Sequence, residues 1–244
     1  MTESYAERYH NIDFQGSLPP VEEFLRVRGR GQEWLEDNYE SLLPANKEAA
    51  ILDIGCGMGE FLYFLKQRGY QKIEGVEISE HLIAYCERLV GCPVTRISDL
   101  QEFLTSHPAR YDVIYLGDVI EHFPKSDLLA ILDALREALR PGGILLVRTN
   151  NAAGVSGPYL RYISLTHEVC FNDLSLRKVL ETVGFKRIRV FGERMRLRRR
   201  PRFIAWLALR KLWFAFLNLA YFIELGTDRP RVLTRTLLAQ ASRE

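Results

Sequence analysis

Four acidic side chains stand at or just after the ends of apolar runs, where they could hold a polar ligand. Asp53 precedes the glycine-rich residues 55–59, Glu77 ends the next apolar run, and Asp99 and Asp118 follow the third and fourth runs. Glycines before a helix let the backbone turn tightly and approach a ligand closely. An acidic residue in the place of Glu77 can accept hydrogen bonds from both hydroxyls of a ribose. These residues predict a ligand that contains a nucleoside.

The glycine loop does not fit the common phosphate-binding patterns. A dinucleotide fingerprint requires its third glycine at position 60, which is Glu60, and the lysine–serine pair of a nucleotide-triphosphate loop is missing. The carboxylate of Asp53 would repel a pyrophosphate but would suit an ammonium group. The ligand is therefore expected to carry a positive charge beside its ribose.

Two histidines are the candidates for acid–base chemistry. His122 follows the fourth apolar run and His167 follows the fifth after a long loop, so both are expected at the ligand edge. A base there can take the proton from an acceptor hydroxyl. Anchoring of its loop is an equally good interpretation of His122. We assign no metal site, although Asp118, Glu121 and His122 leave a divalent ion open.

The elements that must position these residues alternate between strand and helix. Strands separated by helical segments indicate βαβ units and a parallel sheet, whose carboxyl ends share one edge. We expect helices over residues 21–43, 60–68, 79–89, from 99, 126–140 and 174–183. We expect strands over residues 49–54, 72–78, 93–97, 111–116, 144–148, 185–191 and 232–238.

Residues 52–61, 75–79, 118–123 and 139–143 together resemble the class I S-adenosylmethionine-dependent methyltransferases. The resemblance covers residues 49–149 and, with the later strands, most of the chain. It implies an α/β, Rossmann-like fold with helices on both faces of a seven-stranded, mostly parallel sheet whose last strand is antiparallel. It also implies that the cofactor is S-adenosyl-L-methionine.

The resemblance further implies a role for each cofactor residue. Asp53, Gly55 and Gly57 would line the methionine part, Glu77 would hold the ribose, and Asp99 would hold the adenine amino group. Gly117 would face the sulfonium. The complete set of expected cofactor-binding residues is Asp53, Gly55, Cys56, Gly57, Glu77, Ile78, Ser98, Asp99, Leu100 and Gly117.

The acceptor is less sharply indicated. Residues 148–168 and 171–177 resemble the acceptor loops of bacterial methyltransferases associated with surface-polysaccharide biosynthesis. This favours O-methylation of a glycan or a lipid-linked sugar, with a soluble small-molecule O- or N-methyltransferase as the alternative. The sequence after the fourth strand is Gly117-Asp-Val-Ile, unlike the motif of base-methylating enzymes, so we expect no nucleic-acid partner.

The C-terminal quarter differs in charge from the rest. Residues 186–244 hold 15 Lys and Arg against 4 Asp and Glu, whereas residues 1–185 hold 18 against 27. Six arginines in residues 194–202 precede the apolar residues 203–223, which Arg210 and Lys211 interrupt. Two central cations disfavour a membrane span. A helix lying on an anionic membrane fits best, and a homodimer interface or packing on the core are the alternatives.

The chain is therefore expected to have three parts. Residues 1–48 form an N-terminal helical lid, residues 49–193 and 230–240 form the methyltransferase core, and residues 194–229 form a basic, apolar helical insertion. With 47% hydrophobic and 26% charged residues, the composition is that of a globular protein and excludes a disordered chain. The polar start and four scattered cysteines lead us to expect the cytoplasm, with peripheral attachment to the inner face of the membrane.

Overall fold

The computed structural model describes residues 18–27, 29–196 and 201–244. The expected lid is described only from residue 18 onward, as α2 (Val21–Val27), α3 (Gly29–Tyr39) and η1 (Glu40–Leu42). Residues 1–17 of the lid and residues 197–200 of the expected arginine-rich stretch lie outside the described part of the chain.

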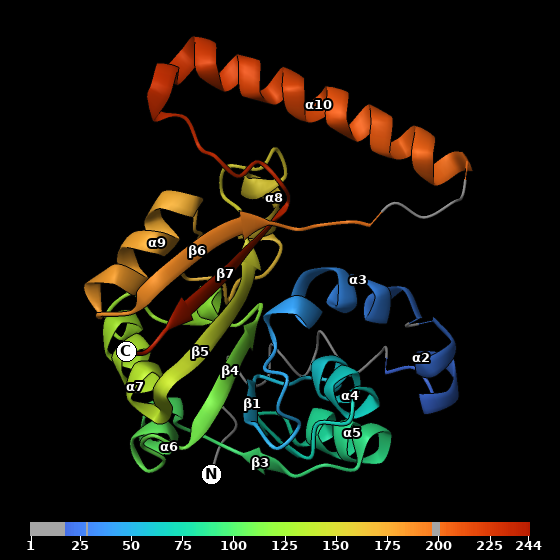
Figure 1. Ribbon diagram of the computed structural model, residues 1–244, viewed down its shortest axis with the longest axis vertical. Coiled ribbons are helices and arrows are strands. Elements are labelled where there is room, and N and C mark those ends of the chain that lie inside the picture. The colour runs from blue at the N-terminus through green and yellow to red at the C-terminus, as the bar shows by residue number, and fades with distance from the viewer. Residues whose placement is uncertain (1–17, 28, 197–200) are drawn as a thin grey trace.

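One seven-stranded sheet organises the molecule, in the order β3-β2-β1-β4-β5-β7-β6 (Figure 1). The strands are β1 (Ala50–Ile54), β2 (Lys72–Glu77), β3 (Val94–Arg96), β4 (Tyr111–Gly117), β5 (Leu139–Asn150), β6 (Lys186–Gly192) and β7 (Thr236–Ser242). Neighbouring strands are parallel except where β7 pairs antiparallel with β5 and β6. The expected fold class is confirmed.

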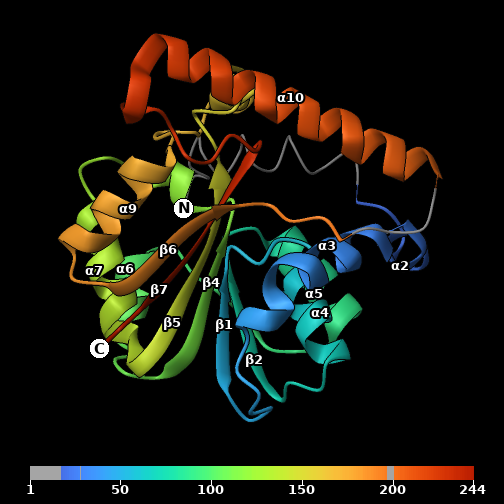
Figure 2. The same cartoon turned by 45° about the horizontal axis from the view of Figure 1, so that its top comes forward.

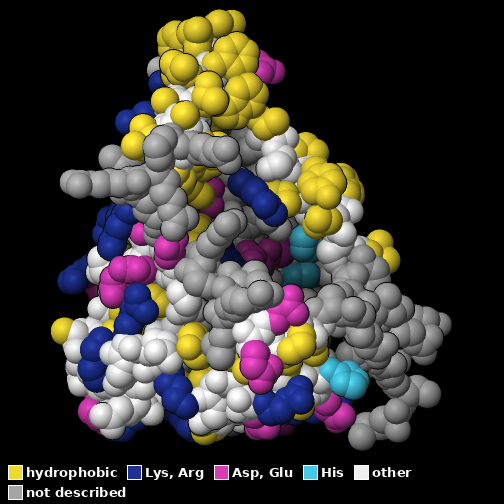
Figure 3. Space-filling view, turned by 90° about the vertical axis from the view of Figure 1, so that its right-hand side faces the viewer, with side chains coloured by type: hydrophobic (Ala, Val, Ile, Leu, Met, Phe, Trp, Pro, Cys, Tyr) yellow, Lys and Arg dark blue, Asp and Glu magenta, His cyan; other side chains and the backbone are white. Residues whose placement is uncertain are grey.

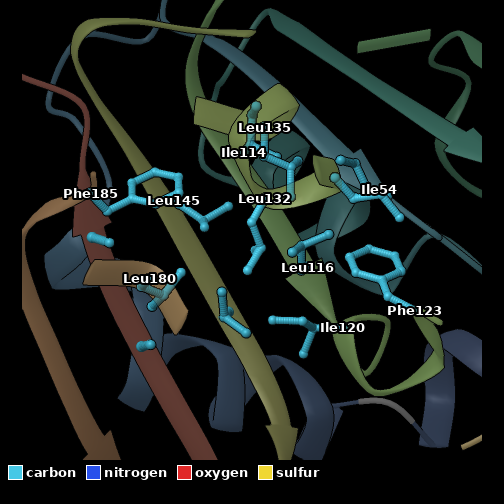
Figure 4. Packing of buried hydrophobic residues seen from close by; sticks show 14 of the residues in the cluster. Ile54, Ile114, Leu116, Ile120, Phe123, Leu132, Leu135, Leu145, Leu180 and Phe185 are labelled. Atoms are coloured by element: carbon cyan, nitrogen blue, oxygen red, sulfur yellow. The ribbon is translucent and has the colours of Figure 1, made fainter. Parts of the chain in front are cut away.

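Helices cover both faces of the sheet (Figure 2). On one face α3 lies with α4 (Glu60–Gln67) and α5 (Glu80–Val90), and on the other lie α6 (Leu100–Thr105), α7 (Leu128–Ala138) and α9 (Asp173–Thr182). Each face has its own buried apolar cluster. Figure 4 shows side chains of β1, β4, β5, α7 and α9 packed together in one of them. Because β1 and β4 are buried on both faces, their sequences are nearly continuous apolar runs.

Two predicted strands begin four or five residues away from the observed ones, whereas the others begin within one residue of them. β5 begins at Leu139, five residues before the expected start, because Leu139 already pairs with Tyr111 of β4. The strand expected over residues 232–238 begins only at Thr236. The side chain of Asn151 explains the second difference, since its Nδ2 donates to the carbonyl oxygens of Val232 and Thr234 at 2.9 and 2.8 Å. Because these two carbonyl groups accept hydrogen bonds from the side chain of Asn151, residues 232–234 form a loop and not part of the strand.

The remaining elements gather at the carboxyl ends of the parallel strands. They are η2 (Ile120–His122), α8 (Gly157–Tyr162), α10 (Pro201–Leu225) and η3 (Gly226–Asp228). α10 follows β6 and crosses this end of the molecule as a long, separate rod (Figure 1). This placement follows from strand direction, because β6 runs toward that edge and β7 returns from it.

Candidate active site

A cavity of about 1140 Å³ lies at the carboxyl ends of β1 to β4. This volume is enough for a cofactor together with an acceptor. The predicted site residues that line it are Asp53, Gly55, Cys56, Gly57, Glu77, Ile78, Ser98, Leu100, Gly117 and His122. Asp99 and His167 are the two predicted site residues outside its lining.

The glycine loop reaches the cavity through a backbone conformation that favours glycine. Gly55 has φ +63°, and a Cβ atom there would stand 2.6 Å from Cγ2 of Val119. The amide N of Gly55 donates to the carbonyl oxygen of Val76 at 2.9 Å, which ties the loop to β2. A larger residue would therefore displace Val119 and close part of the cavity.

Glu77 is fixed by backbone donors at the end of β2. Its Oε2 accepts from the amide N of Gly57 at 3.0 Å, and its Oε1 accepts from the amides of Ile78 and Ser79 at 2.8 and 3.1 Å. A carboxylate has about four lone-pair sites. Glu77 is thus held in one orientation and retains acceptor capacity toward the cavity, as binding of a ribose diol requires.

Asp53 is a buried carboxylate that lines the same cavity. Burial raises the pKa of Asp53 well above its usual range, and the charge of Arg148 partly opposes that shift. Among the described residues no hydrogen bond to its carboxylate is found. A ligand that brings an ammonium group would supply the missing partner, so Asp53 fits the methionine end of S-adenosylmethionine.

Asp99 lies at the N-terminus of α6, outside the lining of the cavity. Its Oδ1 accepts from the amide N of Glu102 at 2.9 Å, and the residue caps the first turn of α6 in an exposed position. Ser98 and Leu100, its neighbours in the chain, line the cavity instead. The predicted contact between Asp99 and an adenine amino group stays a prediction.

At the other end of the cavity, Glu121, His122 and His167 come together. Their candidate ligand atoms all lie within 4.8 Å of one another. The two imidazole rings meet edge to face with centroids 4.8 Å apart, and Figure 3 shows two histidine side chains side by side in a hollow. His122 lines the cavity, whereas His167 is buried behind it. Burial raises the pKa of Glu121 to about 8, and the charge of Asp118 adds to the effect.

Arg148 of β5 and Asp118, which follows β4, form an ion pair that the sequence did not predict. Arg148 at the end of β5 donates to the carboxylate of Asp118, and both residues line the cavity. The guanidinium of Arg148 also lies over the ring of Trp34 of α3, 5.3 Å from its centroid. An arginine at the carboxyl end of a strand is the signal that could have identified this pair.

A family model described as a methyltransferase domain matches residues 27–190. N-terminal Xaa-Pro-Lys N-methyltransferase 1 of Xenopus tropicalis is 26% identical over 185 residues, which cover 74% of this chain and 75% of that protein. Ubiquinone biosynthesis O-methyltransferase of Xylella fastidiosa (strain 9a5c) is 34% identical over 108 residues, but these cover only 42% of each chain.

Among solved structures, a methyltransferase dependent on S-adenosylmethionine from Archaeoglobus fulgidus has the same fold. It superposes with a TM-score of 0.61 at 21% identity and covers 98% of this chain and 100% of its own. At 21% identity this likeness shows the fold alone.

Proposed function

This chain belongs to the S-adenosylmethionine-dependent methyltransferases, and from that premise we propose that it methylates a hydroxyl of a glycan or lipid-linked sugar at the cytoplasmic face of a membrane. When bound, S-adenosylmethionine supplies a methyl group activated by a sulfonium. The protein's task is then to bind and align the acceptor and to remove its proton. The observation that carries the membrane part is the outer surface of α10.

α10 presents apolar side chains to solvent along its length. The most apolar 18-residue stretch within residues 203–228 has a mean hydropathy of 1.4 and is only 6% buried, and length and composition alone would allow this helix to cross a membrane. The exposed apolar residues of α10 are Ile204, Trp206, Leu209, Leu212, Trp213, Phe216, Leu219, Phe222, Ile223 and Leu225. Contiguous apolar surface of this kind marks a binding surface for a protein or a membrane.

The opposite side of α10 is attached to the rest of the protein, which favours a helix lying on a membrane over one crossing it. Arg210 pairs with Glu193 at 3.0 Å, Leu217 is buried, and Tyr221 donates from its hydroxyl to the carbonyl oxygen of Ala153 at 2.9 Å. Glu193 also accepts from Nε1 of Trp34. Crossing a bilayer would break these contacts and leave Arg210 unpaired in hydrocarbon.

A second group of exposed apolar residues lies between α10 and the cavity. It comprises Val155, Tyr159, Tyr162, Ile163 and Leu165 of α8 and its flanking loops, and Leu165 also lines the cavity. Figure 3 shows hydrophobic side chains gathered at the end of the molecule that carries α10. A membrane that contacts both groups would place its headgroups beside the cavity, where a lipid-linked acceptor presents its sugar.

The end of the cavity that His122 lines suits an acceptor that is methylated on a hydroxyl group. A hydroxyl must lose its proton during methyl transfer, and Glu121, His122 and His167 provide a group of acid–base side chains there. The relatives include both an O-methyltransferase and N-methyltransferases. A soluble acceptor methylated on oxygen or nitrogen is therefore the alternative to the proposal.

Sedimentation of the full chain with lipid vesicles tests the membrane part. We expect it to sediment with vesicles that contain anionic lipid, to bind neutral vesicles more weakly, and to be released by salt, since exposed charges are screened over about 10 Å at 0.1 M. The triple variant Leu212→Ser, Phe216→Ser, Leu219→Ser should bind at least roughly 10-fold more weakly, because a buried Leu or Phe contributes about 1.5–3 kcal/mol.

The matched control places the same change on exposed leucines outside α10. Leu129→Ser in α7 and Leu174→Ser in α9 should leave vesicle binding unchanged. If the triple variant binds vesicles as well as the native chain does, or if the native chain ignores lipid charge, the acceptor is not membrane-bound and the soluble alternative takes its place.

A further inference from the structure

Glu121, His122 and His167 form a compact set of one carboxylate and two imidazoles at the acceptor end of the cavity. We propose that this set binds one divalent transition-metal ion, which coordinates the acceptor hydroxyl. The inference deepens the proposed function and rests on it for the identity of the acceptor, but the metal site itself rests only on these side chains and their surroundings.

Backbone hydrogen bonds bring the three residues together from distant parts of the chain. Glu121 and His122 belong to η2, and His167 lies in the loop after α8. The carbonyl oxygen of Glu121 accepts from the amides of Glu168 and Val169 at 2.8 and 3.1 Å. These bonds fix the His167 loop against η2, so the site is formed by the fold before any ion binds.

The surroundings of both imidazoles orient them as metal ligands. Nδ1 of His167 lies 2.8 Å from the carbonyl oxygen of Leu160, and Nδ1 of His122 lies 3.2 Å from the carbonyl oxygen of Thr166. A carbonyl oxygen only accepts, so Nδ1 of His167 is the donor and its Nε2 carries the lone pair. Nδ1 of His122 also lies 2.9 Å from the hydroxyl oxygen of Thr166, which can donate or accept, and the two contacts together hold that imidazole in place. Metal-binding histidines commonly hold their other ring nitrogen in this way.

The carboxylate of Glu121 is oriented as well. Its Oε2 accepts from the hydroxyl of Thr149 at 2.9 Å, and its Oε1 accepts from Nδ2 of Asn150 at 3.3 Å. Glu121 is 1% exposed. A carboxylate buried to this degree needs a cation or a proton, and Arg148, a cation of the described residues near this end of the cavity, is paired with Asp118.

The donor set selects the kind of ion. Two imidazoles and one carboxylate suit Zn²⁺, Fe²⁺ or Co²⁺ better than Mg²⁺ or Ca²⁺, which prefer oxygen ligands. Ligand atoms about 2.0–2.2 Å from such an ion are at most about 4.4 Å apart. The observed limit of 4.8 Å therefore needs only a small closure. Three protein ligands leave further positions open, and His122 places them toward the cavity.

A bound ion would make the acceptor hydroxyl more acidic, so that the three side chains serve as its ligands and do not take the proton themselves. The acceptor oxygen binds the ion, its O–H bond breaks, and the proton passes to solvent beside the exposed Glu168, which lines the cavity. The electron pair of that oxygen forms the bond to the methyl carbon while the carbon–sulfur bond breaks and leaves its pair on sulfur. No oxidant or reductant is needed.

The test is titration of the full-length, metal-free chain with Co²⁺, followed by its visible absorption and by calorimetry. We expect one ion per chain with nitrogen and oxygen ligands and no band from thiolate ligation. His122→Ala, His167→Ala and Glu121→Gln should each weaken binding by about 10-fold or more. His81→Ala, which changes an exposed histidine of α5, should bind Co²⁺ as the native chain does.

S-adenosylhomocysteine binding by the same variants separates loss of the ion from loss of the fold. Each variant that loses Co²⁺ should still bind S-adenosylhomocysteine within about threefold of the native affinity. Where an alanine variant does not, the comparison rests on Glu121→Gln, which keeps the size of the side chain. The inference is overturned if the native chain binds no Co²⁺, if these three changes leave binding intact, or if His81→Ala weakens it equally. None of these outcomes depends on vesicle binding, so the two proposals fail separately.

Discussion

Asp53 couples cofactor binding to pH. In the free protein, burial holds the pKa of Asp53 well above its usual range, whereas an ammonium ligand favours the carboxylate. Binding therefore releases a proton, and affinity for S-adenosylhomocysteine should rise with pH until the raised pKa is passed. Calorimetry in buffers of different ionisation enthalpy would detect the released proton.

Asp53→Asn is the matched variant. It should bind S-adenosylhomocysteine about 10- to 150-fold more weakly, because a charge-assisted hydrogen bond is worth about 1.5–3 kcal/mol, and the proton release should vanish. Without ligand, the folded chain keeps a proton on Asp53 that the unfolded chain loses above a pKa of about 3.9. The contribution of Asp53 to the free energy of unfolding should thus fall as pH rises from about 3.9 toward the raised pKa of Asp53 in the folded chain. Proton release that persists in Asp53→Asn would assign it to another group.

The two ends of the cavity were not equally predictable. Asp53, Gly55 and Glu77 could be placed from the sequence because a glycine loop and an acidic strand end are local signals. The meeting of His122 with His167 has no local signal, since it depends on two backbone hydrogen bonds from the His167 loop to Glu121. For the same reason the burial of His167 behind His122 could not be foreseen.

Asn151 joins two loops at the end of the sheet, and its removal should be costly. Its side chain is buried, donates to the carbonyl oxygens of Val232 and Thr234, and accepts from the amide N of Ala153 at 3.0 Å. Asn151→Ala leaves three buried backbone groups without these partners. At about 1 kcal/mol for each hydrogen bond, we expect a loss of about 3 kcal/mol in urea unfolding.

Asn218→Ala provides the control for that change. Asn218 is exposed on α10 and, among the described residues, donates to the carbonyl oxygen of Phe214 within its own helix, so its replacement should leave the free energy of unfolding within about 0.5 kcal/mol. Equal stability of Asn151→Ala and Asn218→Ala would show that the loops are held by other contacts.

The same asparagine explains where prediction of elements failed. The alternating residues 232–238 have the pattern of a strand, and the side chains give no sign that a distant amide occupies their carbonyl groups. The earlier strands could be predicted because β1 and β4 are apolar along nearly their whole length and end at glycines. Buried parallel strands are distinctive in sequence, whereas the start of an antiparallel strand is set by its partners.

At the scale of the whole molecule, charge and apolar surface share one end. Residues 186–244, which include β6 and α10, hold 15 Lys and Arg against 4 Asp and Glu, while the preceding residues are acidic. Because the cavity opens at the carboxyl ends of the strands, on the side where α10 lies, an anionic surface would attract the protein with its active site facing that surface.

Calorimetric titration of the full chain with S-adenosylhomocysteine tests whether this cavity binds the cofactor. We predict one site per chain in the native protein and binding about 10- to 150-fold weaker in Glu77→Ala, which loses the acceptor for the ribose. Glu74→Ala, on the same strand but paired with Arg110, should bind as the native chain does. No heat from the native chain, or unchanged affinity in Glu77→Ala, would contradict the placement of the cofactor in this cavity.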